Sequence, residues 1–225
     1  MNAAASPLPV VILISGRGSN LQAIINAVAS GRLPVEIRAV ISNRPDAGGL
    51  QLAAKAGITT AVIDHTFYPD RAAFDETLKE CIDGFQPALV VLAGFMRILT
   101  TGFVHHYQGR MLNIHPSLLP DFPGLHTHQR ALEAGCRQHG ASIHFVTEAV
   151  DGGPVVLQAR VPVLQHDTVS TLAARVLEQE HRLYPLAIRW FAEQRLRLDN
   201  TGHAVLDEEV LTGPVIVTQE AEVSF

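Results

Sequence analysis

The sequence has few cysteines, no long apolar run and no excess of basic charge. Cys81 and Cys136 are the two cysteines among 225 residues and lack CxxC spacing, which excludes a disulfide scaffold and is typical of a reduced cytoplasm. The longest apolar stretch, residues 89–96, is far too short to cross a bilayer. The N-terminus has neither the basic start nor the apolar core of a signal peptide. We therefore expect a cytoplasmic protein without a membrane partner.

Charge and composition predict one globular domain with a tail. Lys and Arg total 17 against 22 Asp and Glu, a net charge of −5 that argues against a nucleic-acid partner. Residues 199–225 hold six of the acids and no Lys or Arg, so the rest of the chain is nearly neutral. Apolar residues make up 47%, which is enough for a full core. We predict a domain over residues 1–198 and an acidic C-terminal tail over residues 199–225.

Short aliphatic runs alternate with helical patterns, which is typical of parallel βαβ units. After the last of these units, two strand-like runs are separated by Asp-Gly-Gly, which favours an antiparallel hairpin. The sequence therefore predicts an α/β fold with an open, mainly parallel, Rossmann-like sheet and an antiparallel hairpin near the C-terminal half. The expected strands are 10–15, 36–42, 60–63, 88–93, 110–115, 141–147 and 154–163, with a last short strand at 196–198. The expected helices are 20–29, 50–55, 70–84, 127–135 and 168–191.

A glycine-rich turn, Ser-Gly-Arg-Gly-Ser-Asn over residues 15–20, connects the first expected strand to the first helix. Its backbone N–H groups at a helix start form an anion site, although a tight turn with a Ser or Asn cap is the simpler interpretation. The third glycine of a dinucleotide fingerprint is replaced by Leu21, and no acidic residue ends the second strand. A phosphate monoester therefore fits this turn better than NAD.

Asn113 and His115 occupy positions i and i+2 at the end of a strand, so their side chains leave the same face. An amide beside an imidazole suits a site where negative charge develops on a carbonyl oxygen, although a strand histidine is often structural. Asp151 lies in an Asp-Gly-Gly-Pro turn, where ordinary turn chemistry is the alternative. Glu180 lies on the apolar stripe of the last long helix, where a carboxylate needs a partner or a ligand.

The 11 histidines invite a metal interpretation, above all the pair His126 and His128. The sequence has no HExxH motif and no cysteine pair, so we expect no metal site. The loop after the most apolar strand carries Met96, Arg97, Ile98 and Leu99, which form a largely apolar wall for a flat ring system. Arg97 is either part of that wall or a charge that reaches solvent.

These residues stand in segments that resemble the phosphoribosylglycinamide formyltransferases, the folate-dependent enzymes of purine synthesis, over about residues 10–198. The Asn-x-His-Pro-Ser segment with a later Asp is shared with other formyltetrahydrofolate enzymes. The Gly-Arg-Gly-Ser-Asn turn and the Pro-Gly-Leu-His-Thr-His loop narrow the resemblance to this family. The matching segments are residues 14–24, 93–99, 112–120, 122–128 and 150–154.

The resemblance implies a role for each of these residues. Asn113, His115 and Asp151 are the expected catalytic residues, and the charge of Asp151 is expected to raise the pKa of His115. The ribonucleotide is expected on the phosphate turn and on the long helix, and the folate in the apolar loop. The residues concerned are Gly18, Ser19, Asn20 and Glu180 for the ribonucleotide, and Arg71, Met96, Arg97, Ile98, Leu99 and Asn113 for the folate.

The implied reaction moves a formyl group from 10-formyltetrahydrofolate to the amine of phosphoribosylglycinamide in de novo purine (IMP) biosynthesis. The folate is expected to be a co-substrate, with no tightly bound cofactor. The expected partners are the small-molecule substrates, and the expected oligomeric state is a monomer or homodimer. A formyltetrahydrofolate deformylase is the alternative with the same three residues, but it usually carries an extra N-terminal domain. A methionyl-tRNA formyltransferase needs a C-terminal RNA-binding domain, and a non-catalytic nucleotide-binding module needs no Asn, His and Asp set.

Overall fold

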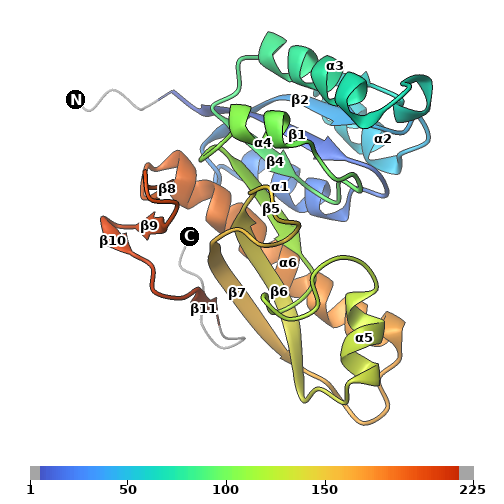
Figure 1. The fold of residues 1–225 in the computed structure, drawn as a ribbon, viewed down its shortest axis with the longest axis vertical. Helices are drawn as coiled ribbons and strands as arrows, with labels where there is room; N and C mark the ends of the chain where they lie inside the picture. The colour runs from blue at the N-terminus through green and yellow to red at the C-terminus, as the bar shows by residue number, and fades with distance from the viewer. Residues whose placement is uncertain (1–5, 218–225) are drawn as a thin grey trace.

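The computed structural model describes residues 6–217, and in this part of the chain eight strands form one twisted sheet (Figure 1). The sheet order is β11-β7-β6-β5-β4-β1-β2-β3, and β8, β9 and β10 form a small separate antiparallel sheet. The bounds are β1 Leu8–Ile14, β2 Val35–Ser42, β3 Thr60–Val62, β4 Leu89–Leu92, β5 Met111–His115, β6 Gln138–Phe145, β7 Val155–Pro162, β8 Leu196–Leu198, β9 Ala204–Leu206, β10 Glu209–Val210 and β11 Val215–Val217.

Helices cover both faces of the large sheet. Alternate residues of β1 belong to two separate buried clusters: Val10 and Ile12 pack with α1, α2 and α6, and Val11 and Leu13 pack with α3 and α4. Because both faces are covered, β1 is a continuous apolar run and not an alternating one. The helices are α1 Ser19–Ala29, α2 Gly48–Lys55, α3 Arg71–Gly84, α4 Thr101–His106, α5 Thr127–Glu133 and α6 Val169–Ala192, with a 3₁₀ turn η1 His65–Phe67.

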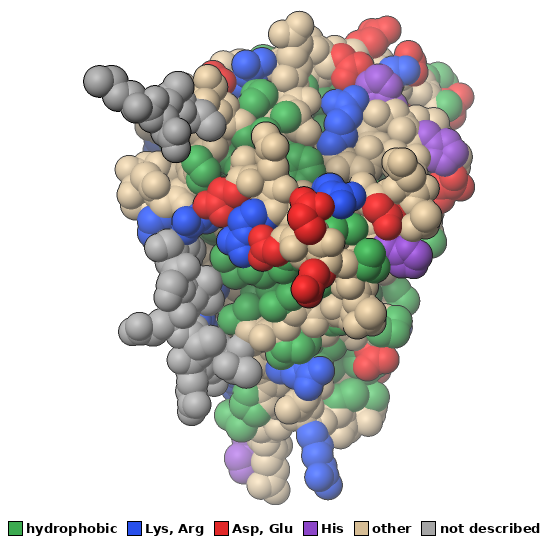
Figure 2. All heavy atoms as spheres, turned by 90° about the vertical axis from the view of Figure 1, so that its left-hand side faces the viewer, with side chains coloured by type: hydrophobic (Ala, Val, Ile, Leu, Met, Phe, Trp, Pro, Cys, Tyr) green, Lys and Arg blue, Asp and Glu red, His purple; other side chains and the backbone are tan. Residues whose placement is uncertain are grey.

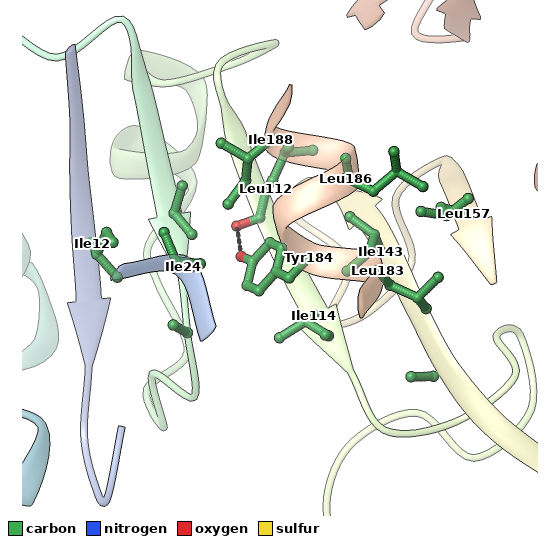
Figure 3. Packing of buried hydrophobic residues seen from close by; sticks show 14 of the residues in the cluster. Ile12, Ile24, Leu112, Ile114, Ile143, Leu157, Leu183, Tyr184, Leu186 and Ile188 are labelled. Carbon is green, nitrogen blue, oxygen red and sulfur yellow. Dashed lines mark hydrogen bonds between the residues drawn. The ribbon is translucent and has the colours of Figure 1, made fainter. Parts of the chain in front are cut away.

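The long helix α6 packs across the middle of the sheet, and its fully buried Tyr184 contacts the sheet backbone (Figure 3). The Tyr184 hydroxyl lies 2.9 Å from the carbonyl oxygens of both Leu92 and Leu112. A buried hydroxyl needs such a partner, and these carbonyls belong to the neighbouring strands β4 and β5. Tyr184 therefore joins the helix layer to the two strands that lead into the cleft described below.

The order of the strands reverses between β1 and β4. From β1 the chain proceeds outward through β2 and β3, and from β4 it proceeds in the other direction to β5, all four contacts being parallel. Open α/β sheets bind their ligands at such a reversal, outside the carboxyl ends of the strands. The topology therefore predicts a ligand site among the loops that follow β1, β4 and β5.

The predicted fold class is confirmed: the large sheet is mainly parallel, and β6 and β7 form an antiparallel hairpin attached to β5. The helix α4 and the 3₁₀ turn η1 were not predicted, because they are too short to show a helical period. The expected last short strand at residues 196–198 is present as β8, and it lies in the small sheet, not the large one. Within residues 6–217 no helix is apolar enough over a sufficient length to span a bilayer.

The acidic segment after Leu198 is folded against the rest of the chain up to residue 217. Its strands β9 and β10 continue the small sheet begun by β8, and β11 pairs in parallel with β7 at the edge of the large sheet. Arg195 makes a bidentate ion pair with Asp207, with N···O distances of 2.7 and 2.8 Å, and Arg197 forms an ion pair with Glu208. Figure 2 shows this side of the molecule, where acidic and basic side chains are mixed. Glu220 and Glu222 lie outside the described residues.

Removal of residues 199–225 is expected to lower stability and to leave intact the activity that the sequence resemblance implies. The truncation deletes buried Ala204, Val205 and Val217 and uncovers the edge of β7, which we expect to cost about 3 kcal/mol or more of unfolding free energy. Chemical unfolding and kcat/KM, measured on the truncated and full-length proteins, test this. Deletion of residues 218–225 alone is the control. A truncated protein that stays folded but loses kcat/KM would show that the segment contributes to the reaction.

Candidate active site

The three expected catalytic residues form one cluster at the end of β5. Asn113 and His115 leave the same face of this strand, and the loop between β6 and β7 brings Asp151 against them. The His115 Nδ1 atom lies 3.3 Å from Asp151 Oδ2, and the Asn113 amide nitrogen lies 3.5 Å from Asp151 Oδ1. His115 is 6% exposed, so this contact is shielded from water. An amide, an imidazole and a carboxylate thus share one small space.

Two backbone groups of the loop after β5 hold the cluster in place. His115 Nε2–H donates to the carbonyl oxygen of Phe122 at 2.9 Å, and the Gly124 N–H donates to Asp151 Oδ2 at 2.8 Å. Phe122 and Asp151 both have positive φ values, 53° and 52°, which L-residues rarely adopt. Such strain persists where surrounding contacts impose it, and it is common at ligand sites.

A cleft of about 570 Å³ opens beside this cluster. Its size is typical of a small-molecule site. Met96 and Ile98 line one side and are 66% and 52% exposed, and Leu125 and Val150 add exposed apolar side chains. The expected folate residues of the 96–99 loop therefore line the same cleft as Asn113, His115 and Asp151.

The two arginines expected to contact folate are placed differently. Arg97 lines the cleft, but its guanidinium also lies over the Phe74 ring, 4.6 Å from the ring centre. Arg97 therefore combines features of both interpretations. Its side chain forms part of the cleft wall, and its guanidinium is held against the Phe74 ring of α3. Arg71 is the first residue of α3, exposed, and is not among the residues that line the cleft.

The glycine-rich turn precedes α1, whose first backbone N–H groups receive no side-chain cap. Gly18 has φ +81°, and a Cβ added there would lie 2.7 Å from the Cα of Gly49 at the start of α2. Glycine at 18 is therefore required both by the backbone conformation and by the close approach of α2. Ser19 and Asn20 begin α1, and uncapped N–H groups at a helix start are suited to an anion.

Glu180, on the long helix, is joined to this turn. The Asn20 side-chain amide donates to Glu180 Oε2 at 2.7 Å, across 160 residues of sequence. Burial raises the pKa of Glu180 above its ordinary value, and the Asn20 hydrogen bond opposes that rise. Asn20 Oδ1 is buried with no hydrogen-bond partner in the structure. The pair thus offers acceptor oxygens to a ligand that brings hydroxyl groups.

Comparison with known proteins identifies the family of the chain. A family model described as formyl transferase matches residues 8–188, which is most of the chain. The chain belongs to the formyl transferase family. The resemblance expected from the sequence motifs is therefore confirmed.

Several relatives of this formyl transferase have names that specify a substrate. The phosphoribosylglycinamide formyltransferase of Escherichia coli K12 is 55% identical over 189 residues, which cover 84% of this chain and 89% of the relative. The human trifunctional purine biosynthetic protein adenosine-3 is 46% identical over 86% of this chain and 19% of its own length. The solved phosphoribosylglycinamide formyltransferase of Coxiella burnetii is 52% identical, with a TM-score of 0.90 over 94% of this chain and 100% of that one.

Burial and charge act in opposite directions on the pKa values of the clustered residues. Burial lowers the pKa of His115 below its ordinary value; the Phe122 carbonyl and the Asp151 carboxylate raise it, but less than burial lowers it. The expected upward effect of the Asp151 charge is therefore present, but burial outweighs it, so the net shift of the His115 pKa is downward. For Asp151, burial raises the pKa, but His144, the Gly124 N–H and the charge of His115 together hold it below its ordinary value. At neutral pH the site thus pairs an ionised Asp151 with a mainly neutral His115.

His144 belongs to the same cluster and was not expected from the sequence. It lies opposite Asn113 in the β5–β6 pairing, and its Nε2 is 3.1 Å from the Asn113 amide nitrogen. Its Nδ1–H donates to the Phe145 carbonyl, so Nε2 accepts from Asn113 and orients the amide. Knowing which residue of β6 pairs with Asn113 would have identified His144. That register depends on both strands and cannot be predicted from the sequence of one strand alone.

Two further histidines, His128 in the lining of the cleft and the buried His139, lie close together. His139 is 1% exposed and lies edge-on to His128 and Phe122. Among residues 6–217, no three His, Cys, Asp or Glu side chains are arranged to hold one metal ion. Burial, together with the charge of the neighbouring His128, lowers the pKa of His139 to about 4.

Folding stability is expected to fall as the pH drops from about 6.5 to about 4, because the unfolded chain binds a proton at His139 that the folded chain excludes. The full difference is worth about 3 kcal/mol, and His115 and His128 act in the same direction. Urea unfolding across this pH range measures the effect, and His139→Phe should flatten the slope. An identical slope in the two proteins would contradict the assignment to His139.

Proposed function

We propose that this formyl transferase moves the formyl group of 10-formyltetrahydrofolate to the amine of phosphoribosylglycinamide, giving formylglycinamide ribonucleotide and tetrahydrofolate in purine biosynthesis. The observation that carries the proposal is the cluster of Asn113, His115 and Asp151 beside an apolar cleft. The names of the relatives from E. coli and C. burnetii support the choice of acceptor.

In the first step the glycinamide nitrogen attacks the formyl carbon and the carbonyl electrons move to oxygen. Asn113 is the proposed donor to that oxygen. Its amide nitrogen has a firm partner in His144 at 3.1 Å and a long contact with Asp151 at 3.5 Å. The second amide hydrogen is therefore weakly held and free to donate where charge develops.

In the second step His115 transfers the proton. Mainly neutral in the free enzyme, it accepts a proton from the attacking nitrogen and gives it to N10 as the carbon–N10 bond breaks. Both of its ring nitrogens face acceptors, the Asp151 carboxylate and the Phe122 carbonyl, which stabilise the protonated ring when it forms. For this transfer Nε2 leaves the Phe122 carbonyl and the neutral ring carries its hydrogen on Nδ1, where it donates to Asp151, so that Nε2 is free to accept the proton from the attacking nitrogen and pass it to N10.

The two substrates are proposed to occupy opposite sides of the cluster. The ribonucleotide phosphate binds the N–H groups of Gly18, Ser19 and Asn20 at the start of α1, and Glu180 accepts from the ribose hydroxyls. The folate ring packs against Met96, Arg97, Ile98 and Leu99, with Asn113 at its formyl group. Arg71, outside the lining of the cleft, is proposed to meet the acidic end of the folate.

We further propose that residues 1–198 carry the whole reaction, since every proposed site residue lies between Gly18 and Glu180. The enzyme would act in the cytoplasm, as a monomer or homodimer, on small molecules without nucleic acid or a membrane. 10-Formyltetrahydrofolate would serve as a co-substrate, with no tightly bound cofactor and no metal.

Supplying three acceptors separately tests the proposed reaction. The purified protein is mixed with 10-formyltetrahydrofolate and either phosphoribosylglycinamide, water alone or methionyl-tRNA, and the formylated product or free formate is measured. We expect rapid transfer to the ribonucleotide only. Formate release at the same rate with and without ribonucleotide would overturn the proposal in favour of a deformylase, and formylated tRNA would indicate a different acceptor.

A further inference from the structure

Ser15 lies at the reversal of strand order, directly after β1, and contacts the loop that follows β4. Its backbone N–H donates to the Gly94 carbonyl at 3.1 Å, and its hydroxyl oxygen accepts from the Met96 N–H at 2.8 Å. Ser15 is 7% exposed. One residue thus links the start of the glycine-rich turn to the 94–99 loop.

The Ser15 hydroxyl is oriented from its other side by Asn43, which follows β2. The hydroxyl donates to Asn43 Oδ1 at 2.5 Å, and Asn43 is 3% exposed. The Asn43 carbonyl in turn accepts from His65 Nδ1–H at 2.9 Å, which secures the backbone at this point. Because Asn43 occupies the hydroxyl hydrogen, the Ser15 oxygen lone pairs are directed to the Met96 N–H.

The far end of the same loop is held by a second buried side chain. Asp75, on α3, accepts from the Thr100 N–H at 2.6 Å and is 2% exposed. Between these two attachments, Met96 and Ile98 project into the cleft with little packing of their own, at 66% and 52% exposure. The backbone attachments at the two ends, together with buried Phe95 and the stacking of Arg97 on Phe74, therefore set the position of this cleft wall.

We propose that Ser15 and Asn43 are positioning residues that fix the folate-facing 94–99 loop relative to the ribonucleotide-binding turn. The proposal rests on the proposed function, because it concerns the alignment of its two substrates. Neither side chain needs to touch a reacting atom. Acyl transfer between two bound molecules requires the attacking nitrogen and the formyl carbon to approach within about 3–3.5 Å, and a displacement of about 1 Å costs up to about 10²-fold in rate.

Ser15→Ala removes the acceptor of the Met96 N–H and leaves that group without its partner. We expect kcat to fall about 10-fold and the KM for folate to rise several-fold, because the loop shifts away from the turn. The Kd for ribonucleotide alone, measured by calorimetry, should remain within about 2-fold, because the α1 N–H groups are unchanged. Asn43→Ala should reproduce this pattern, whereas Asn43→Asp, which keeps the acceptor oxygen, should restore most of the rate.

Ser42→Ala is the matched control. Ser42 is fully buried at the end of the neighbouring strand β2, and its hydroxyl bonds only to the nearby backbone of Arg44. Ser42→Ala should lower the folding stability by about as much as Ser15→Ala does, without changing kcat or the KM for folate. If Ser15→Ala lowers the melting temperature as Ser42→Ala does, with wild-type kcat and KM, the positioning role is wrong.

Binding of a non-reactive folate analogue separates this proposal from the proposed function. Calorimetry with the analogue needs no acceptor, so weaker binding to Ser15→Ala than to Ser42→Ala supports the positioning of the loop whichever acceptor the enzyme uses. Equal binding to the two variants would overturn it. Failure of the wild-type enzyme to formylate phosphoribosylglycinamide would count only against the proposed acceptor.

Discussion

Replacing His115 by alanine is expected to lower kcat by about 10²-fold or more, with a much smaller change in substrate binding. The imidazole is proposed to act only as the proton moves, so its removal raises the barrier more than it weakens the ground-state complex. Asp151→Asn should have a similar effect, because the neutral amide no longer stabilises the protonated ring 3.3 Å away. Asn113→Ala should also lower kcat, because the developing oxyanion loses its donor.

Steady-state kinetics with saturating folate and ribonucleotide measure kcat, and circular dichroism establishes that each variant is folded. His106→Ala is the control, since His106 pairs with Asp83 on the exposed side of α4, away from the cleft. Near wild-type turnover in any folded variant of the three would show that its assigned role is wrong. A rise in KM alone would assign that residue to binding.

Glu180→Gln is expected to weaken ribonucleotide binding by about 10- to 10²-fold, the typical value of a hydrogen bond to a charged group. The substitution keeps the size of the side chain but replaces the carboxyl group that accepts from the Asn20 amide at 2.7 Å by an amide. Unfolding free energy at neutral pH should not fall. Burial raises the pKa of Glu180, so its ionised form is disfavoured by folding at pH values above its ordinary pKa, and the neutral amide removes that cost.

Calorimetric titration with the ribonucleotide, together with urea unfolding of the same samples, tests both parts of this prediction. Glu178→Gln is the matched control, because Glu178 lies two residues earlier on α6 and is exposed. Unchanged ribonucleotide affinity in Glu180→Gln would contradict the proposed contact between Glu180 and the ribose. A loss of folding stability would instead indicate that Glu180 serves mainly to anchor Asn20.

Local patterns in the chain were sufficient to predict most of the architecture. The alternation of apolar runs and helical stripes depends on backbone periodicity, so β1, β2, β5 and α6 were located to within a few residues. The common face of Asn113 and His115 follows from the two-residue period of a strand. The short helix α4 has too few residues for a period to show, and the tail strands pair only because β8 and β7 are present.

By itself the sequence determined which residue types stand at the ends of which strands, and that Glu180 would be a buried carboxylate on α6. Only the tertiary structure decided which distant groups meet: Glu180 with Asn20, His144 with Asn113, and Ser15 with Met96. It also decided that burial, more than the charge of Asp151, governs the pKa of His115. The physical reason is the same in each case. Periodicity is a property of neighbouring residues, whereas strand register, burial and desolvation depend on chain segments that only folding brings together.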